Sequence, residues 1–93
     1  MIGSAKDKRI APIMAGQTPP RFPPDLVRPT QKAVRLLMAA TKVEDLRLPP
    51  SNRLEQLKGD RAGQWSIRIN RQWRLCFRWS EQGAEDVEIV DYH

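Results

Sequence analysis

Residues 64–79 read QWSIRINRQWRLCFRW, and this stretch decides the fold class. Apolar side chains stand at every second position in two runs, 65–69 and 73–79, with mostly polar or charged residues between them. Successive side chains of a β-strand point to opposite faces of a sheet, so each run predicts a strand with one apolar face. The two runs together predict an antiparallel strand pair joined by residues 70–72.

The register of this pair follows from the apolar pattern, because residues directly opposite one another share a face. Placing Ile69 and Trp73 both inward makes them a pair and leaves residues 70–72 as the loop. The other expected pairs are Trp65 with Phe77, Ile67 with Leu75, Arg68 with Arg74 and Gln64 with Arg78. Like charges directly opposite are destabilising, so the two arginines indicate an anion between them. Alternatively, both guanidinium groups point into water or reach the acidic strand.

The flanking patterns complete an α+β fold with the element order βααββββ, in which helices cover one face of a mainly antiparallel sheet. Beyond the central pair we expect strands at 1–4, 53–57 and 87–90, helices at 7–15 and 30–40, and turns at 58–63 and 80–85. In the second helix, Ala33, Val34, Leu37 and Ala40 form an apolar stripe that should pack on the apolar sheet face. Residues 41–44 fit a capping box for one further turn.

Residues 18–29 carry five of the eight prolines. Proline fixes φ and lacks an N–H donor, so this segment predicts a loop between two elements. The loop is either mobile or braced by its prolines. The 93 residues suffice for a single domain, which we expect to span residues 1–93.

Composition excludes several classes of protein. A single cysteine and a single histidine exclude an internal disulfide, a cysteine-based zinc site and a histidine-rich metal site. No apolar run approaches the ~20 residues of a membrane span, and residues 1–9 lack the apolar stretch of a signal peptide, which favours a cytoplasmic protein. The chain has 16 Lys and Arg against 11 Asp and Glu, and the net charge of +5 suits a nucleic-acid or acidic protein partner.

The charges are segregated along the chain. Residues 53–78 hold seven basic residues and two acidic ones, whereas residues 81–91 hold five acidic residues and no basic one. Either neighbouring strands of opposite charge pair across the sheet, or a basic anion-binding surface has acidic groups at its margin. The basic residues are Arg53, Lys58, Arg61, Arg68, Arg71, Arg74 and Arg78.

A basic sheet face of this kind suits RNA cleavage without a metal ion. In that reaction the ribose 2′-hydroxyl loses a proton and attacks the adjacent phosphate, and preorganised cations stabilise the developing charge. Arg68 and Arg74 are candidates for binding the phosphate, with Lys58 at a strand end. His93 is a candidate for proton transfer, although a single histidine at a chain end is more often structural or incidental. Nothing indicates a phosphate-binding glycine loop, a nucleophilic serine or a reactive thiol at Cys76.

Four segments carry a resemblance to a known family: PPSNRLE (49–55), LKGDRAGQWSIRIN (57–70), QWRLCF (72–77) and VEIVDYH (87–93). The sequence resembles the HigB-like branch of the RelE toxin superfamily, the toxin halves of type II toxin–antitoxin operons. The resemblance covers essentially the whole chain and is specific for residues 49–93. It implies a compact α+β ribonuclease-like fold and an endoribonuclease that works without metal or cofactor and cleaves mRNA in the ribosomal A site, inhibiting translation.

The resemblance also implies partners and site residues. The partners would be the ribosome with its mRNA and a HigA-type helix-turn-helix antitoxin, with operator DNA contacted only through the antitoxin complex. By position, Arg68 and Arg74 match the phosphate-facing arginines, Lys58 matches the lysine of the Leu-Lys-Gly motif, and Asp91, Tyr92 and His93 match the functional tail. We add Arg61 and Arg78 of the basic run as RNA-binding candidates.

The sequence departs from the family pattern at three positions. Glu55 stands where some members carry histidine, which removes a two-imidazole mechanism. Ala5 replaces a common aromatic residue, and Pro29 interrupts the expected helix start. Two other functions fit the basic face: a catalytically weak relative that acts mainly as antitoxin partner and operator corepressor, and a plain RNA-binding or ribosome-docking protein.

Overall fold

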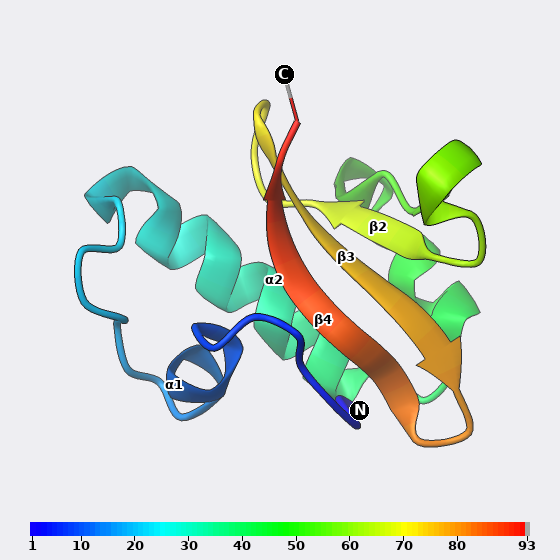
Figure 1. Cartoon of the computed structure of the whole chain (residues 1–93), viewed down its shortest axis with the longest axis horizontal. Helices are drawn as coiled ribbons and strands as arrows, with labels where there is room; N and C mark the ends of the chain where they lie inside the picture. The colour runs from blue at the N-terminus through cyan, green and yellow to red at the C-terminus, as the bar shows by residue number, and fades with distance from the viewer. Residues whose placement is uncertain (93) are drawn as a thin grey trace.

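The structure is a computed structural model that describes residues 1–92. Its strands are β1 (Glu55–Gln56), β2 (Trp65–Arg68), β3 (Trp73–Ser80) and β4 (Gly83–Asp91), which form an antiparallel sheet in the order β1-β2-β3-β4. Helix α2 (Val27–Ala39) crosses behind this sheet, and the short α1 (Ile10–Met14) packs against α2 beside β4 (Figure 1). Single 3₁₀ turns connect these elements: η1 (Pro24–Leu26), η2 (Val43–Arg47), η3 (Pro50–Asn52) and η4 (Gly59–Arg61). The expected α+β class is confirmed.

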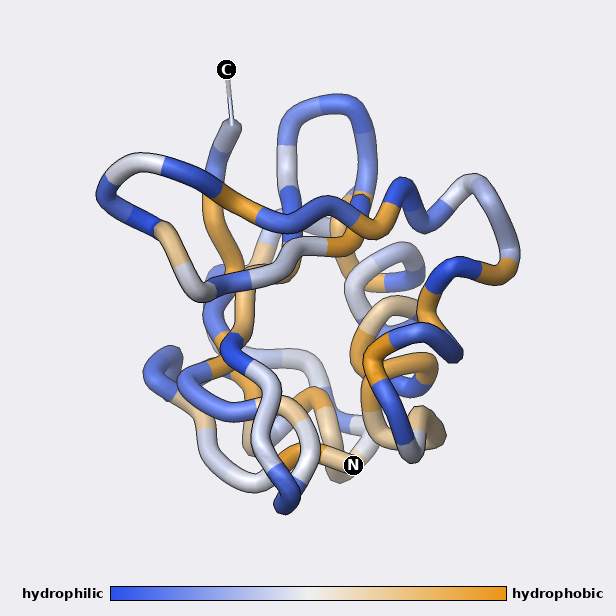
Figure 2. The backbone as a smooth tube through the Cα atoms, turned by 90° about the vertical axis from the view of Figure 1, so that its right-hand side faces the viewer, coloured by the Kyte–Doolittle hydropathy of each residue, from blue (hydrophilic) through white to orange (hydrophobic). Residues whose placement is uncertain are grey.

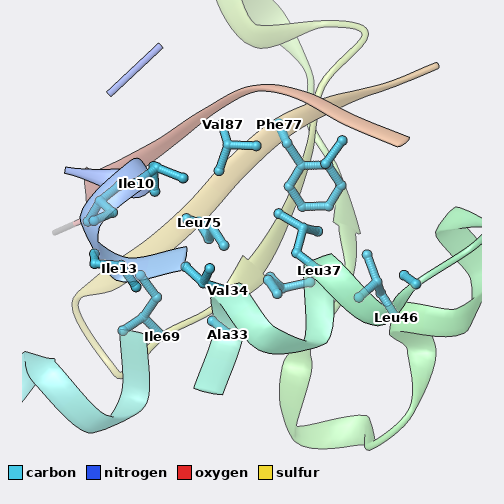
Figure 3. Packing of buried hydrophobic residues seen from close by; sticks show 14 of the residues in the cluster. Ile10, Ile13, Ala33, Val34, Leu37, Leu46, Ile69, Leu75, Phe77 and Val87 are labelled. Atoms are coloured by element: carbon cyan, nitrogen blue, oxygen red, sulfur yellow. The ribbon is translucent and has the colours of Figure 1, made fainter. Parts of the chain in front are cut away.

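The apolar stripe of α2 packs on the sheet as predicted. Ala33, Val34, Leu37 and Ala40 are all buried, and they join Ile67, Ile69, Leu75 and Phe77 in one hydrophobic cluster. Figure 3 shows Leu37 next to Phe77 and Val34 beside Leu75. Viewed from the side, the helical coils and the strands form two layers, with hydrophobic stretches in both (Figure 2). This packing buries one face of the sheet, and the charged residues Arg68 and Arg74 lie on the other.

The predicted register of the central strand pair is confirmed. Trp65 lies opposite Phe77, Ile67 opposite Leu75, and Arg68 opposite Arg74. The Ile69 amide donates to the Trp73 carbonyl at 2.9 Å, which leaves residues 70–72 as the loop. The Asn70 side chain closes this loop by accepting from the amides of residues 72 and 73, both at 2.8 Å. Strand β2 begins at Trp65, so the expected pairing of Gln64 with Arg78 lies just outside the ladder.

The expected N-terminal strand is reduced to two isolated parallel bridges, Ile2 with Ala84 and Ala5 with Val87. The order βααββββ is therefore wrong in its first element. The pairing between the N-terminal segment and β4 is interrupted at Asp86. This residue has a left-handed φ of 53°, and its amide donates to the Ser4 hydroxyl instead of to a backbone carbonyl.

Several element boundaries also differ from the prediction. Helix α2 begins at Val27 rather than Thr30, because Pro29 falls in its first turn, where the missing N–H has no partner to lose. Strand β4 begins at Gly83 rather than Val87, because its first residues pair with the end of β3, Ala84 with Trp79 and Gly83 with Ser80. A Cβ at Gly83 would collide with the Met1 carbonyl. The first strand of the second half shrinks from 53–57 to Glu55–Gln56, because Arg53 has a φ of 47°.

Two further expectations about the helical half need correction. Helix α1 covers only Ile10–Met14 of the expected 7–15. The turn after α2 is capped by Asp45 rather than Glu44: its carboxylate accepts from the Thr41 and Lys42 amides at 3.0 and 3.2 Å. The carboxylate position differs by one residue because η2 begins at Val43, which puts Asp45 at its third position.

The proline-rich segment 18–29 is anchored to the core. Phe22 and Leu26 are 8% and 2% exposed and belong to the hydrophobic cluster. The Arg9 guanidinium lies 5.9 Å from the centre of the Phe22 ring. These contacts support the braced form of the loop. No helix within residues 1–92 has the length and apolar character to cross a membrane.

Candidate functional site

The face of the sheet turned away from α2 carries a hollow lined by arginines. Side chains alternate along β2 and β3, so Ser66 and Arg68 share this face with their ladder partners Cys76 and Arg74. The hollow has a volume of about 430 Å³. We call it the arginine hollow; its lining residues are Arg53, Arg68, Asn70, Arg71, Arg74 and Tyr92.

Arg74 is the most firmly held of these arginines. Its Nε donates to the Ser66 hydroxyl at 2.8 Å, and its NH2 nitrogen donates to the Arg53 carbonyl at 2.6 Å. Both acceptors are neutral, so these contacts leave the positive charge of the guanidinium uncancelled. Arg68 lies directly across from it and also borders a smaller hollow against α2. The arrangement concentrates positive charge on this part of the sheet face.

Tyr92 crosses the open face at the end of β4. Its amide donates to the Gln72 carbonyl at 2.6 Å, and its hydroxyl bonds to the sulfur of Cys76. Burial raises the pKa of the Tyr92 hydroxyl and of the Cys76 thiol. Both groups are therefore neutral at pH 7, and Tyr92 can offer a ring face and a hydrogen-bonding hydroxyl.

A second hollow lies on the other side of Tyr92. It has a volume of about 460 Å³ and is lined by Glu55, Gln56, Leu57, Lys58, Arg61 and Tyr92. We call it the lysine hollow. Arg61 donates from NH1 to Glu88 Oε1 at 2.7 Å and to Gln64 Oε1 at 3.0 Å, and the bond to Glu88 raises the pKa of its guanidinium. This ion pair fixes η4, which begins directly after Lys58, against the sheet.

The structure brings together most of the residues singled out from the sequence. Arg68, Arg74 and Tyr92 line the arginine hollow, while Lys58 and Arg61 line the lysine hollow beside it. Arg78 lies apart, in a hollow with Lys6, Gln64, Asp86 and Glu88, and its Nε is 3.7 Å from Asp86 Oδ2. Asp91 accepts from the Gln72 side chain at 3.2 Å at the end of the ladder. The expected role of His93 concerns a residue outside the described part of the chain.

The structure shows opposite charges pairing at the margin of the basic face, whereas the anion-binding surface stays a prediction. Acidic residues of β4 pair with basic ones at the margin, where Glu88 lies 2.7 Å from Arg61 and 3.9 Å from Lys6. The arginine hollow, in contrast, is lined by four arginine residues. Within residues 1–92 no three His, Cys, Asp or Glu side chains are grouped so that they could hold a metal ion.

Sequence reasoning missed several members of this site. Arg53 and Arg71 line the arginine hollow, and Glu55 lines the lysine hollow. Both arginines belong to the basic run of residues 53–78. Strand periodicity could not assign them to a sheet face, because Arg53 lies in a left-handed turn and Arg71 in a loop. Ser66 was assigned to the outer face without a role.

Comparison of structures identifies the fold. The chain matches a chain of the YoeB–YefM complex from Staphylococcus aureus with a TM-score of 0.62, covering 100% of this chain and 95% of the other at 16% sequence identity. The fold is thus the RelE-like fold of that toxin. Residues 13–93 match the model of the HigB-like family, described as RelE-like toxins of the type II toxin–antitoxin system HigB, and the chain belongs to this family.

Three curated proteins are similar in sequence. Toxin HigB-1 of Vibrio cholerae is 48% identical over 48 residues, which is 52% of this chain and 50% of that protein. Endoribonuclease HigB of Proteus vulgaris is 42% identical over 41 residues, or 44% and 45% of the two chains. An uncharacterized protein of Haemophilus influenzae is 33% identical over 74 residues, or 80% and 73%. The chain therefore spans about half the length of the two named HigB relatives in these matches.

Proposed function

We propose that this protein is the toxin of a type II toxin–antitoxin module and that it cleaves mRNA on the ribosome. Membership of the HigB-like family supports the toxin class, and the similarity to a protein named Endoribonuclease HigB supports the reaction. The observation that carries the proposal is the arginine hollow beside Tyr92, in which four arginines line a space of about 430 Å³.

The proposed reaction uses these groups in a metal-independent cleavage. The ribose 2′-oxygen attacks the adjacent phosphorus, a P–O bond to the 5′-oxygen breaks, and one proton leaves the 2′-hydroxyl while another reaches the leaving oxygen. Arg68 and Arg74 bind the non-bridging oxygens and stabilise the additional negative charge. Tyr92 packs against a base or ribose, and Lys58 contacts the flanking phosphate. We propose that the terminal segment, Asp91 and His93, supplies proton transfer.

The openness of the site supports the proposed dependence on the ribosome. Both hollows are open to solvent, so we expect the protein alone to supply positive charge but little positioning of an RNA strand. A ribosome holding mRNA in the A site would fix the position of the scissile phosphate. Positioning of reacting groups can account for a large part of the reduction in activation free energy.

We further propose a cytoplasmic location and a HigA-type helix-turn-helix antitoxin as the partner that neutralises the toxin. The structural neighbour is itself a complex with a second protein, and the family is defined by such modules. Contact with operator DNA would occur only through the antitoxin.

The test is induction of the chain without an antitoxin, followed by mapping of the 5′ ends of cellular mRNA. We expect growth arrest and new 5′ ends within translated codons. Purified protein should cut mRNA on programmed ribosomes far faster than naked mRNA. Equal rates on the two substrates would contradict ribosome dependence, and binding of an antitoxin–operator complex without any cleavage would favour the corepressor function.

A further inference from the structure

We infer that Ser66 and the backbone carbonyl of Arg53 are positioning groups that fix the guanidinium of Arg74 in the arginine hollow. This inference rests on the proposed function, because the two groups would hold an arginine that we propose to bind phosphate. The evidence is the pair of hydrogen bonds from Arg74, 2.8 Å to Ser66 Oγ and 2.6 Å to the Arg53 carbonyl.

Ser66 is a buried polar residue at the centre of the charged face. It lies in β2 directly opposite Cys76 and is fully buried, although it points to the same sheet face as Arg68 and Arg74. A buried hydroxyl needs a hydrogen-bond partner, and here the partner is the Nε–H of Arg74. This bond fixes the orientation of the guanidinium plane. Neither Ser66 nor the Arg53 carbonyl accepts from the NH1 nitrogen of Arg74. The N–H groups of this nitrogen can meet phosphate oxygens in the fork geometry that arginine favours.

Arg53 contributes from a different element. It follows η3 with a left-handed φ of 47°, a conformation that non-glycine residues rarely adopt. Its amide donates to the Pro50 carbonyl at 3.0 Å, and its own carbonyl accepts from Arg74. Arg53 is also one of the residues that line the arginine hollow. Unusual backbone conformations persist where surrounding contacts enforce them, and they are concentrated at functional sites. One turn therefore supplies both an acceptor and a further positive charge.

The need for such positioning follows from the charges. Arg68 lies directly opposite Arg74, and repulsion between them would drive the two side chains apart in the absence of a ligand. Two neutral acceptors hold Arg74 in place without cancelling its charge. The donor is then already aligned when phosphate charge develops, which is the condition for strong electrostatic catalysis.

The test compares Ser66→Ala with Ser66→Thr, which restores the hydroxyl, and with Arg74→Ala. On programmed ribosomes we expect Ser66→Ala to lower kcat by about 10- to 100-fold with KM nearly unchanged, and Ser66→Thr to recover most of the loss. In NMR spectra, the Arg74 Nε–H should exchange slowly with water in the wild type and in Ser66→Thr, and fast in Ser66→Ala. Wild-type kcat in Ser66→Ala together with an inactive Arg74→Ala would overturn the inference.

A second pair of variants tests the carbonyl and does not depend on Ser66→Ala folding. Arg53→Gly and Arg53→Val both remove the guanidinium, but only valine resists the left-handed conformation that directs the carbonyl to Arg74. We expect kcat to fall further in Arg53→Val than in Arg53→Gly, and equal values would refute a role for the carbonyl. If the wild type itself cleaves no mRNA, the proposed function fails, whereas the NMR comparison still decides whether Ser66 fixes Arg74.

Discussion

Arg68 and Arg74 face each other with like charges, yet they differ in what holds them. Arg74 has two hydrogen-bond acceptors, whereas Arg68 mainly borders open hollows. We expect Arg68→Ala to raise the free energy of unfolding by a few tenths of a kcal/mol through relief of repulsion. Arg74→Ala should lower it by about 0.5–1.5 kcal/mol, because the lost hydrogen bonds outweigh that relief. Urea unfolding of both variants measures the difference, and a gain in stability for Arg74→Ala would contradict it.

Cys76 lies beneath the same face and should be chemically inert. It is fully buried, and burial raises the pKa of its thiol, so little thiolate exists near neutral pH. We expect iodoacetamide at pH 8 to label the native protein slowly and the urea-unfolded protein rapidly. The exposed thiol of a short peptide is the control. Equally fast labelling of the native protein would show that Tyr92 does not cover the sulfur.

At the residue scale, the sequence predicted side-chain positions correctly where they depend on the alternation of apolar and polar residues along a strand. The pairing of Arg68 with Arg74 followed from placing Ile69 and Trp73 on one face, and the structure confirms it. The part played by Arg53 could not be predicted, because it depends on one left-handed residue that brings a loop carbonyl over the sheet. Such a contact is tertiary and leaves no periodic trace in the sequence.

Helix α2 contributes Ala33, Val34 and Leu37 to the hydrophobic cluster, and truncations on its two faces should have different effects on stability. Leu37 is fully buried, whereas its neighbour Met38 is 39% exposed. We expect Leu37→Ala to cost about 2–5 kcal/mol of unfolding free energy and Met38→Ala to change it by less than about 0.5 kcal/mol. Chemical denaturation followed by circular dichroism compares the two, and similar losses would contradict the assigned face.

The N-terminal segment is tied to β4 by Asp7. Its carboxylate accepts from the Arg9 side chain and from the Ile89 amide at 3.1 Å. Burial alone would raise the pKa of Asp7, but the hydrogen bonds from Arg9 and Ile89 outweigh it, and the pKa is lowered below 3.8. The carboxylate therefore stabilises the fold above the unfolded-state value, and this contribution is lost as pH falls through the lower folded-state value.

We expect Asp7→Asn to remove that pH dependence. Its thermal midpoint should lie below that of the wild type at pH 6, and the gap should narrow as the pH is lowered from about 5 to 2. Glu44→Gln, at an exposed position on η2, is the control and should follow the wild type. A constant difference between the two thermal midpoints over this pH range would mean that the charge of Asp7 does not contribute to stability.

At the element scale, prediction failed where distant segments meet. The end of β4 nearest Gly83 has the composition of a turn, but it pairs with the end of β3, and residues 1–5 add two isolated bridges on its other side. The start of α2 was misplaced because a proline was treated as an interruption rather than as a first-turn residue. The apolar stripe of α2 was strong enough to predict its packing face correctly.

The whole molecule separates stability from function across a single sheet. One face is covered by the helices and holds the hydrophobic cluster, while the other carries Ser66, Cys76, the arginine hollow and the lysine hollow. Figure 1 shows β4 running along one edge of the sheet. At the end of this strand the Tyr92 amide donates to the Gln72 carbonyl in the loop that follows β2. This division lets charged residues gather on one face without weakening the core.

The rate of mRNA cleavage on programmed ribosomes, measured under single-turnover conditions, decides whether the arginine hollow carries the reaction. The comparison is between Arg74→Ala and Arg35→Ala, which removes the same charge from an exposed position on α2. We expect Arg74→Ala to slow cleavage by about 100- to 1,000-fold, as for loss of one preorganised donor, and Arg35→Ala to stay within about twofold of the wild type. Equal rates for the two variants would show that total charge, and not the hollow, governs activity.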